Sequence, residues 1–174
     1  KELEKSRSLT FESTGFQNLL MDAKKNLSQE QIILLETLNN DYNKDTSNLE
    51  KLKNIASKWY EFGYPSLSGH YAEMIASKKN DEDTWMIAGT TYSICIKNSQ
   101  IEKERNFCMN RAVKAYENAI SINPANVDLK INLALCYVDL PPANEPMKGI
   151  LALRTLNEKY PDNVNVLNQL ARLA

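Results

Sequence analysis

The chain has 174 residues, of which 25% are charged, and its formal net charge is −1. This length fits one domain or one short repeat array, and the composition is that of a folded globular protein. The near-neutral charge lacks the basic excess of general nucleic-acid or anionic-membrane binders, so no nucleic-acid partner is expected. No apolar run approaches the ~18 residues that cross a bilayer.

The first 44 residues predict a polar lead-in and then two helices. Residues 1–14 are polar and aperiodic, which favours a flexible lead-in. Residues 15–44 carry apolar side chains at helical spacing and are expected to form a helical pair. Ser28, followed three residues later by Gln31, has the spacing of a capping box that begins the second helix of this pair.

A helix is next expected over about 46–62, with Trp59 on its apolar side. A turn follows, and Pro65 is well placed to open another helix, which ends near Asn80. We expect Trp59, and Trp85 further along, to be core residues rather than binding anchors.

The clearest pattern lies between residues 83 and 126. Large residues alternate with Ala and Gly on one side of each of two helices: Trp85, Ala88, Gly89 and Tyr92, then Ala112, Tyr116, Ala119 and Pro124. Two such helices can pack closely, because a large residue of one helix fits against an Ala or Gly of the other. A turn at 98–100 and a long helix over about 101–122 are expected. The charged start of this helix (Glu102, Lys103, Glu104 and Arg105) is expected to overhang the array as a solvated face.

The pattern returns once more and then stops halfway. Asn126 is a good N-cap for a helix with Ala134 at the notch position, and a longer loop over 140–146 leads to a partner helix. Asn163 can cap a final helix carrying Leu167 and Leu170, whose apolar side needs a cover. Either this helix caps the array or the natural chain continues.

This arrangement resembles the tetratricopeptide repeat (TPR), whose signature is W-x2-L-G-x2-Y…A-x3-F…P with a period of 34 residues. Gly89 and Ala134 are 45 residues apart, which is the period plus an insertion of eleven. The resemblance implies an all-α fold, a right-handed α-α superhelix of about three helix pairs. The array is expected over 45–174, with repeats at about 46–80, 82–126 and 127–163 and a partial repeat at 164–174.

Catalytic chemistry has no recognisable motif in the chain. The only histidine, His70, is expected to be structural or exposed. The three cysteines, Cys95, Cys108 and Cys136, form no C-x2-C pair, so we expect small apolar fillers rather than a disulfide framework or a zinc site. We therefore predict no enzyme activity, no catalytic residue, no metal and no cofactor.

A TPR array would use its concave face, lined by the first helix of each repeat. The resemblance places the following residues there as partner-binding candidates: Lys53, Tyr60, Met86, Thr90, Ile94, Ile131, Leu135 and Val138. Met86 and Ile131 depart from the Lys, Asn and Arg pattern of TPR co-chaperones that grip a C-terminal carboxylate. So many apolar side chains need a cover, which is a partner helix, a second copy of the chain, or the N-terminal helices folded back.

The segment Glu145-Pro146-Met147-Lys148-Gly149-Ile150, after a Leu-Ala-x-Cys-Tyr helix, is similar to one in membrane-anchored TPR proteins of Bacteroidetes-type bacteria. The resemblance implies a place in the cell envelope, with any membrane contact made by a segment preceding Lys1. The leading hypothesis is a non-catalytic scaffold that binds a peptide or helix of a protein partner. The alternatives are a homodimer module and an accessory domain of a larger protein.

Overall fold

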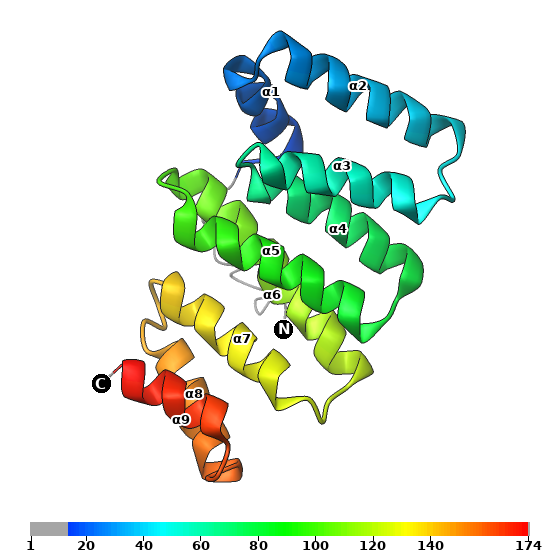
Figure 1. Ribbon diagram of the computed structural model, residues 1–174. Coiled ribbons are helices and arrows are strands. Elements are labelled where there is room, and N and C mark those ends of the chain that lie inside the picture. The colour runs from blue at the N-terminus through cyan, green and yellow to red at the C-terminus, as the bar shows by residue number, and fades with distance from the viewer. Residues whose placement is uncertain (1–13, 174) are drawn as a thin grey trace, which may run out of the picture.

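The computed structural model describes residues 14–173, and this part of the chain contains α-helices and no strand. The helices are α1 (Phe16–Asn26), α2 (Gln29–Lys44), α3 (Leu49–Glu61), α4 (Pro65–Lys79), α5 (Glu82–Asn98), α6 (Glu102–Ile122), α7 (Val127–Asp139), α8 (Lys148–Lys159) and α9 (Val164–Arg172). From α3 onwards each helix packs against the next, so that hairpins stack into a curved array (Figure 1). The expected all-α superhelical fold is confirmed.

The helix ends follow the capping residues of the sequence. Ser28 and Gln31 form both bonds of a capping box at the start of α2, and the backbone N–H of Gln31 donates to Ser28 Oγ at 3.2 Å. Pro65 is the first residue of α4, where its missing N–H costs nothing. Asn126 and Asn163 cap α7 and α9 with their side chains. These boundaries agree with the sequence prediction to within a few residues.

The close approach of neighbouring helices depends on glycine. A Cβ atom added to Gly89 would lie 2.8 Å from the Tyr116 ring, and one added to Gly69 would lie 2.7 Å from the Tyr92 ring. At Gly149 the obstacle is the backbone itself, because the Ala134 carbonyl oxygen would be 2.6 Å away. The pairs α4–α5, α5–α6 and α7–α8 therefore each contain a contact that a side chain would push apart.

The core consists of three clusters along the array. The central one joins α4, α5, α6 and α7 and contains Trp85, Tyr92 and Tyr116. A second lies under the N-terminal helices and contains Trp59, and a third joins α7, α8 and α9. Trp59 and Trp85 are 1% and 7% exposed, which confirms that both are core residues.

The insertion in the central repeat lengthens both helices of the pair. The helix α5 runs six residues past Tyr92, to Asn98, and the start of α6 packs against this extension. Arg105 donates from Nε to the Ile96 carbonyl at 2.9 Å and from a terminal nitrogen to the Asp139 carbonyl at 2.9 Å. The expected solvated overhang is therefore wrong for Glu104 and Arg105, which are half-buried with partners, while Glu102 and Lys103 are exposed.

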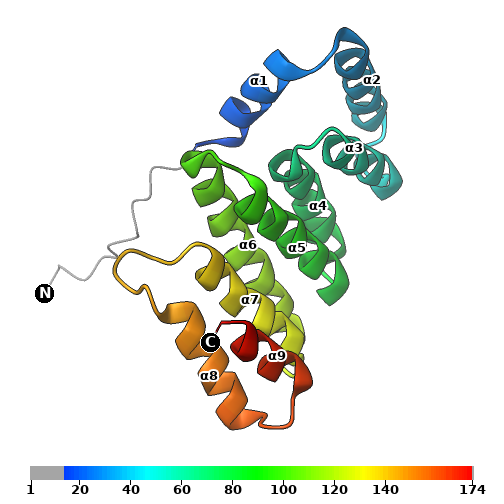
Figure 2. The ribbon, with the colours of Figure 1, turned by 60° about the vertical axis from the view of Figure 1, so that its left-hand side comes forward.

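The two N-terminal helices diverge like the arms of a V above α3 and α4 (Figure 2). The helix α2 packs on α3, and α1 packs on α4, where the Phe16 ring stacks on the His70 ring with centroids 3.8 Å apart. Both helices thus extend one end of the array and lie far from α7 (Figure 1).

Extra methylene groups in a filled core typically cost about 1–3 kcal/mol. We predict that Gly89→Leu lowers the free energy of unfolding by more than this, because its four added carbon atoms must displace Tyr116. Thermal melting followed by circular dichroism measures this. The control is Gly15→Ala, since nothing lies within 4 Å of a Cβ atom at Gly15. An unchanged melt of Gly89→Leu would contradict the proposed packing of α5 on α6.

Candidate interaction surface and pocket

Three of the groove candidates are exposed on the first helices of the first two pairs. Tyr60 of α3 is 50% exposed. Lys53, also on α3, is exposed, and its ammonium group lies 2.6 Å from the Glu50 carboxylate one turn away. Thr90 of α5 is exposed as well, and its hydroxyl is 3.2 Å from the Tyr116 hydroxyl. These side chains are accessible to a partner without any rearrangement of the core.

The two apolar candidates on α5 are half-buried. Met86 packs against the central cluster. Ile94 also keeps part of its side chain in contact with solvent. Each side chain is therefore partly packed within the protein and leaves part of its apolar surface exposed.

The three candidates on α7 pack against the C-terminal helices. Ile131 is 4% exposed and belongs to the cluster that includes Val166 of α9. Leu135 and Val138 are half-buried against the same cluster. Ile131, one of the partner-binding candidates, is therefore covered within the protein itself. The cover comes from α8 and α9 rather than from the N-terminal helices, because each first helix of a repeat array packs on the next one.

A hydroxyl cluster lies beneath this surface, where α5, α6 and α7 meet. Ser93 Oγ is 3.3 Å from the Tyr116 hydroxyl and 3.3 Å from Cys136 Sγ. Burial raises the pKa of the Cys136 thiol to about 11 and also raises the pKa of Tyr116. At neutral pH both groups stay protonated, so this cluster provides hydrogen bonds and no nucleophile.

A half-buried carboxylate links the second helix of one pair to the next pair. Glu73 of α4 accepts a hydrogen bond from the Tyr92 hydroxyl at 2.9 Å and pairs with the Arg111 guanidinium at 3.0 Å. Burial, followed by the Glu73 charge, raises the pKa of Tyr92. The Arg111 charge compensates the carboxylate, so the arrangement fixes α4, α5 and α6 together rather than preparing a catalytic acid.

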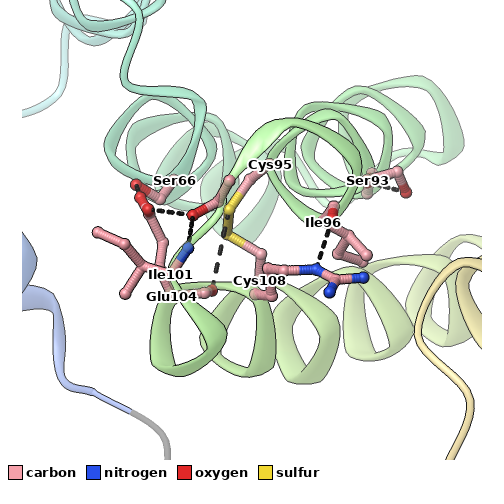
Figure 3. Close-up of a disulfide and its surroundings, with 10 residues drawn as sticks. Ser66, Ser93, Cys95, Ile96, Ile101, Glu104 and Cys108 are labelled. Carbon is pink, nitrogen blue, oxygen red and sulfur yellow. Dashed lines mark hydrogen bonds between the residues drawn. A yellow bond between two sulfur atoms is a disulfide. The ribbon is translucent and has the colours of Figure 1, made fainter.

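A disulfide joins α5 to the start of α6. Cys95 and Cys108 are bonded, with their Cα atoms 6.1 Å apart, and both residues are buried (Figure 3). Beside it the Glu104 carboxylate accepts hydrogen bonds from Ser66 Oγ at 2.5 Å and Ser99 Oγ at 2.6 Å. The expectation that these two cysteines are reduced apolar fillers is wrong. Cys136 is the free cysteine of the three.

Motif spacing does not predict this pairing, because the two cysteines form no C-x2-C pattern. Cys95 and Cys108 are 13 residues apart, and they meet only because both helices of the central pair are extended. The signal that could have found it was the helical hairpin itself. A turn at 98–100 places residues on either side of it next to one another.

The V formed by α1 and α2 contains a pocket of about 420 Å³, which we call the V-pocket. Its walls are Leu20 and Lys24 of α1 with Leu35, Glu36, Asn39 and Asn40 of α2. Its floor is formed by Trp59 of α3 and Tyr71 of α4, and the Tyr71 hydroxyl donates to Asn39 Oδ1 at 3.1 Å. None of these residues was a candidate in the sequence, because they come from four separate helices.

Two kinds of feature are not found in the part of the chain that the structure describes. Residues 14–173 contain no group of three or more His, Cys, Asp or Glu side chains that could hold a metal ion. Within the same range no helix is both long enough and apolar enough to cross a membrane.

Comparison with known proteins supports the fold. No family model matches the sequence, and no curated protein matches it. The crystal structure of MamA is similar over 78% of this chain and 72% of MamA, with 17% sequence identity and a TM-score of 0.51. A second similar structure is a thermophilic TPR protein from Thermus thermophilus. The match covers 90% of this chain and 97% of that protein, with 12% sequence identity and a TM-score of 0.42, which is too low to support the fold assignment.

The repeat spacing, the stacked helical hairpins and the likeness to MamA together define a TPR-like fold. At this level of sequence identity the likeness describes the fold alone.

We predict that the disulfide stabilises the fold by about 3 kcal/mol, the value for closing a loop of this length. The double variant Cys95→Ala/Cys108→Ala should melt at a lower temperature than the oxidised protein. Reduction should lower the melting temperature of Cys136→Ala but not that of the double variant. Alkylation of denatured, unreduced protein should modify one cysteine, and modification of all three would contradict the pairing.

We predict that protonation of His70 destabilises the protein. Burial lowers the pKa of His70; nearby Glu73 raises it and Arg111 lowers it. Because the folded pKa is below the ordinary value of about 6.5, the unfolded state binds the proton first. Stability should therefore fall as the pH drops below about 6.5 and stop falling below the folded pKa.

Urea denaturation between neutral and weakly acidic pH measures this effect, with His70→Gln as the comparison. The variant should lack the slope in this range, because the chain has no other histidine. The carboxylates with lowered pKa values, Asp45 and Asp81, act only at more acidic pH. Equal slopes for the two proteins would contradict the assignment.

Proposed function

We propose that this protein is a non-catalytic scaffold that binds a peptide or helix of a protein partner along the first helices of its repeats. The observation that carries the proposal is the exposure of Tyr60, Lys53 and Thr90 at groove positions of α3 and α5. A half-exposed tyrosine on a rigid helix is a typical anchor of protein interfaces. Lys53, two turns earlier on α3, would exchange its ion pair with Glu50 for an acidic residue of the partner.

The apolar candidates would act in two ways. Met86 and Ile94 would offer their exposed remainder to apolar residues of the partner, as in helix-in-groove recognition. Leu135 and Val138 would continue this surface onto α7. Ile131 would hold α7 against α9 and so act through the shape of the surface.

We place the protein in an oxidising compartment such as the bacterial cell envelope. The buried disulfide supports this location, because disulfides persist outside the reducing cytosol. The disulfide would also hold α5 against α6, and so keep the proposed binding surface rigid for a partner in the envelope.

Site-specific photo-crosslinking in the native host tests the scaffold proposal. A photoreactive residue in place of Tyr60 or Thr90 should give the same crosslinked partner. The matched control is Ile33, which is 54% exposed on α2 and outside both proposed interaction surfaces. The purified partner should bind Tyr60→Ala at least tenfold more weakly than wild type, a loss of about 1.4 kcal/mol. Crosslinks at Ile33 alone, or unchanged binding, would contradict the proposal.

A second candidate function is self-association through the C-terminal end. Leu151 of α8 is 55% exposed, and Val164 and Leu167 of α9 are 65% and 44% exposed. Such apolar exposure at the end of a repeat array favours contact with another surface. Sedimentation of wild type and Leu167→Asp tests it. A dimer lost in the variant supports self-association, and a monomer at all concentrations excludes it.

A further inference from the structure

The last helix of the array, α9, leaves open a face that is covered on the other first helices. Ala171 of α9 corresponds to Ala134 of α7, which lies 37 residues earlier, one repeat period plus the longer loop. Ala134 is 1% exposed, because α8 packs on it so closely that a Cβ atom at Gly149 would lie 2.6 Å from the Ala134 carbonyl oxygen. Ala171 is exposed, and Leu167, one turn before it, is 44% exposed. The open face of α9 therefore has the shape that receives another α-helix.

At the opposite end of the array, α2 is a second helix without a first helix packed closely beside it. Each second helix packs on the first helix of the next pair, as α4 does on α5 and α6 on α7, and α2 packs on α3 in the same way. The helix that precedes it in the chain, α1, packs on α4 instead and diverges from α2 (Figure 2). The side of α2 that faces α1 therefore borders an open pocket, the V-pocket.

The V-pocket has room for a large apolar side chain. Its volume of about 420 Å³ lies within the range of about 300–1,000 Å³ that holds whole small molecules. Leu20 of α1 and Leu35 of α2 provide apolar wall, and Leu20 is only half-buried. A leucine side chain that enters the pocket removes its own apolar surface and that of Leu20 from water.

The two ends of the array also differ in charge. The helices α1 and α2 carry four carboxylates against three lysines, namely Asp22, Glu30, Glu36 and Asp41 against Lys24, Lys25 and Lys44. The helices α8 and α9 carry one carboxylate against four cations, namely Glu158 against Lys148, Arg154, Lys159 and Arg172. Two C-terminal ends therefore repel each other, whereas a C-terminal end is attracted to an N-terminal end.

We propose that α9 of one copy of this chain docks beside α2 of a second copy, with the side chain of Leu167 in the V-pocket. The open face of α9 then receives α2 as its second helix, and the contact completes a helix pair from two molecules. This inference rests on the self-association proposed above and names the surface that the second copy contributes. No groove candidate lines the V-pocket, so the scaffold proposal can stand or fail without it.

Such a contact is heterologous, because it joins two different surfaces at opposite ends of the molecule. A copy that has lost one of the surfaces still offers the other. A contact between two α9 helices would be isologous instead, and a copy with a blocked α9 would then have nothing left to offer. This difference separates the two modes of association.

Sedimentation velocity of two variants, alone and mixed, tests the geometry. Leu167→Asp blocks α9, and Asn40→Arg, at an exposed residue of α2 that lines the V-pocket, blocks the pocket with a further positive charge. Each variant alone should associate at least tenfold more weakly than wild type. An equal mixture should recover association, because Leu167→Asp keeps its V-pocket and Asn40→Arg keeps its α9. The recovered species should be a dimer, since both of its remaining surfaces are blocked.

The matched controls add the same charges at neighbouring exposed positions. Asn168→Asp lies next to Leu167 on α9, and Thr37→Arg lies on α2 outside the lining of the V-pocket. Both should associate as wild type does in about 0.15 M salt, where exposed charges are screened beyond about 8 Å. All four substitutions change exposed residues, so the melting temperature should stay that of wild type.

Three outcomes would overturn the inference. A wild type that stays monomeric at every concentration removes the self-association as well, and leaves the groove proposal intact. Association of Asn40→Arg as strong as that of wild type overturns the inference alone, because self-association then uses α9 without the V-pocket. A mixture that fails to recover the dimer, although wild type associates, also overturns the inference alone.

Discussion

The packing of tyrosine rings onto glycines is the contact on which this array depends. Tyr92 fills the space over Gly69, and Tyr116 fills the space over Gly89, so α4, α5 and α6 approach more closely than side chains on both helices would allow. Burying each ring removes a large apolar area from water. The same tyrosines carry the hydroxyl contacts to Glu73 and Ser93. Close packing and polar linkage are therefore provided by the same residues.

The extended central pair has a particular mechanical role. Its added turns contain the disulfide, and they contain the Arg105 contacts to the Ile96 and Asp139 carbonyls. These contacts join α5, α6 and the end of α7 at the point where the array leads to its C-terminal helices. A surface formed by successive first helices keeps its shape only if their relative positions are fixed. The insertion stabilises that geometry rather than adding a separate element.

The two ends of the array differ in how well they are filled. At the C-terminal end, α8 and α9 cover the apolar side chains of α7, and the exposed apolar residues lie on their outer sides. At the N-terminal end, α1 and α2 diverge and leave the V-pocket over Trp59 and Tyr71. A helix pair that does not close on itself creates a cavity that a regular repeat lacks. This is why the pocket has no counterpart in the repeat pattern.

The sequence by itself determined the helices, their caps and the repeat period. Alternating large and small residues around Gly89, and capping residues such as Ser28 and Asn163, act locally, so their spacing is sufficient to predict them. It also determined that Trp59 and Trp85 belong to the core. These features depend on residues within one or two helices.

Only the tertiary structure decided the rest. Cys95 meets Cys108 because two helices are extended together, and Ile131 is covered because α9 packs beside α7. The V-pocket exists because α1 and α2 diverge above α3 and α4, an arrangement that no local spacing encodes. Contacts between residues distant in sequence depend on the relative placement of whole helices, and that placement is fixed only by the packing of the complete array.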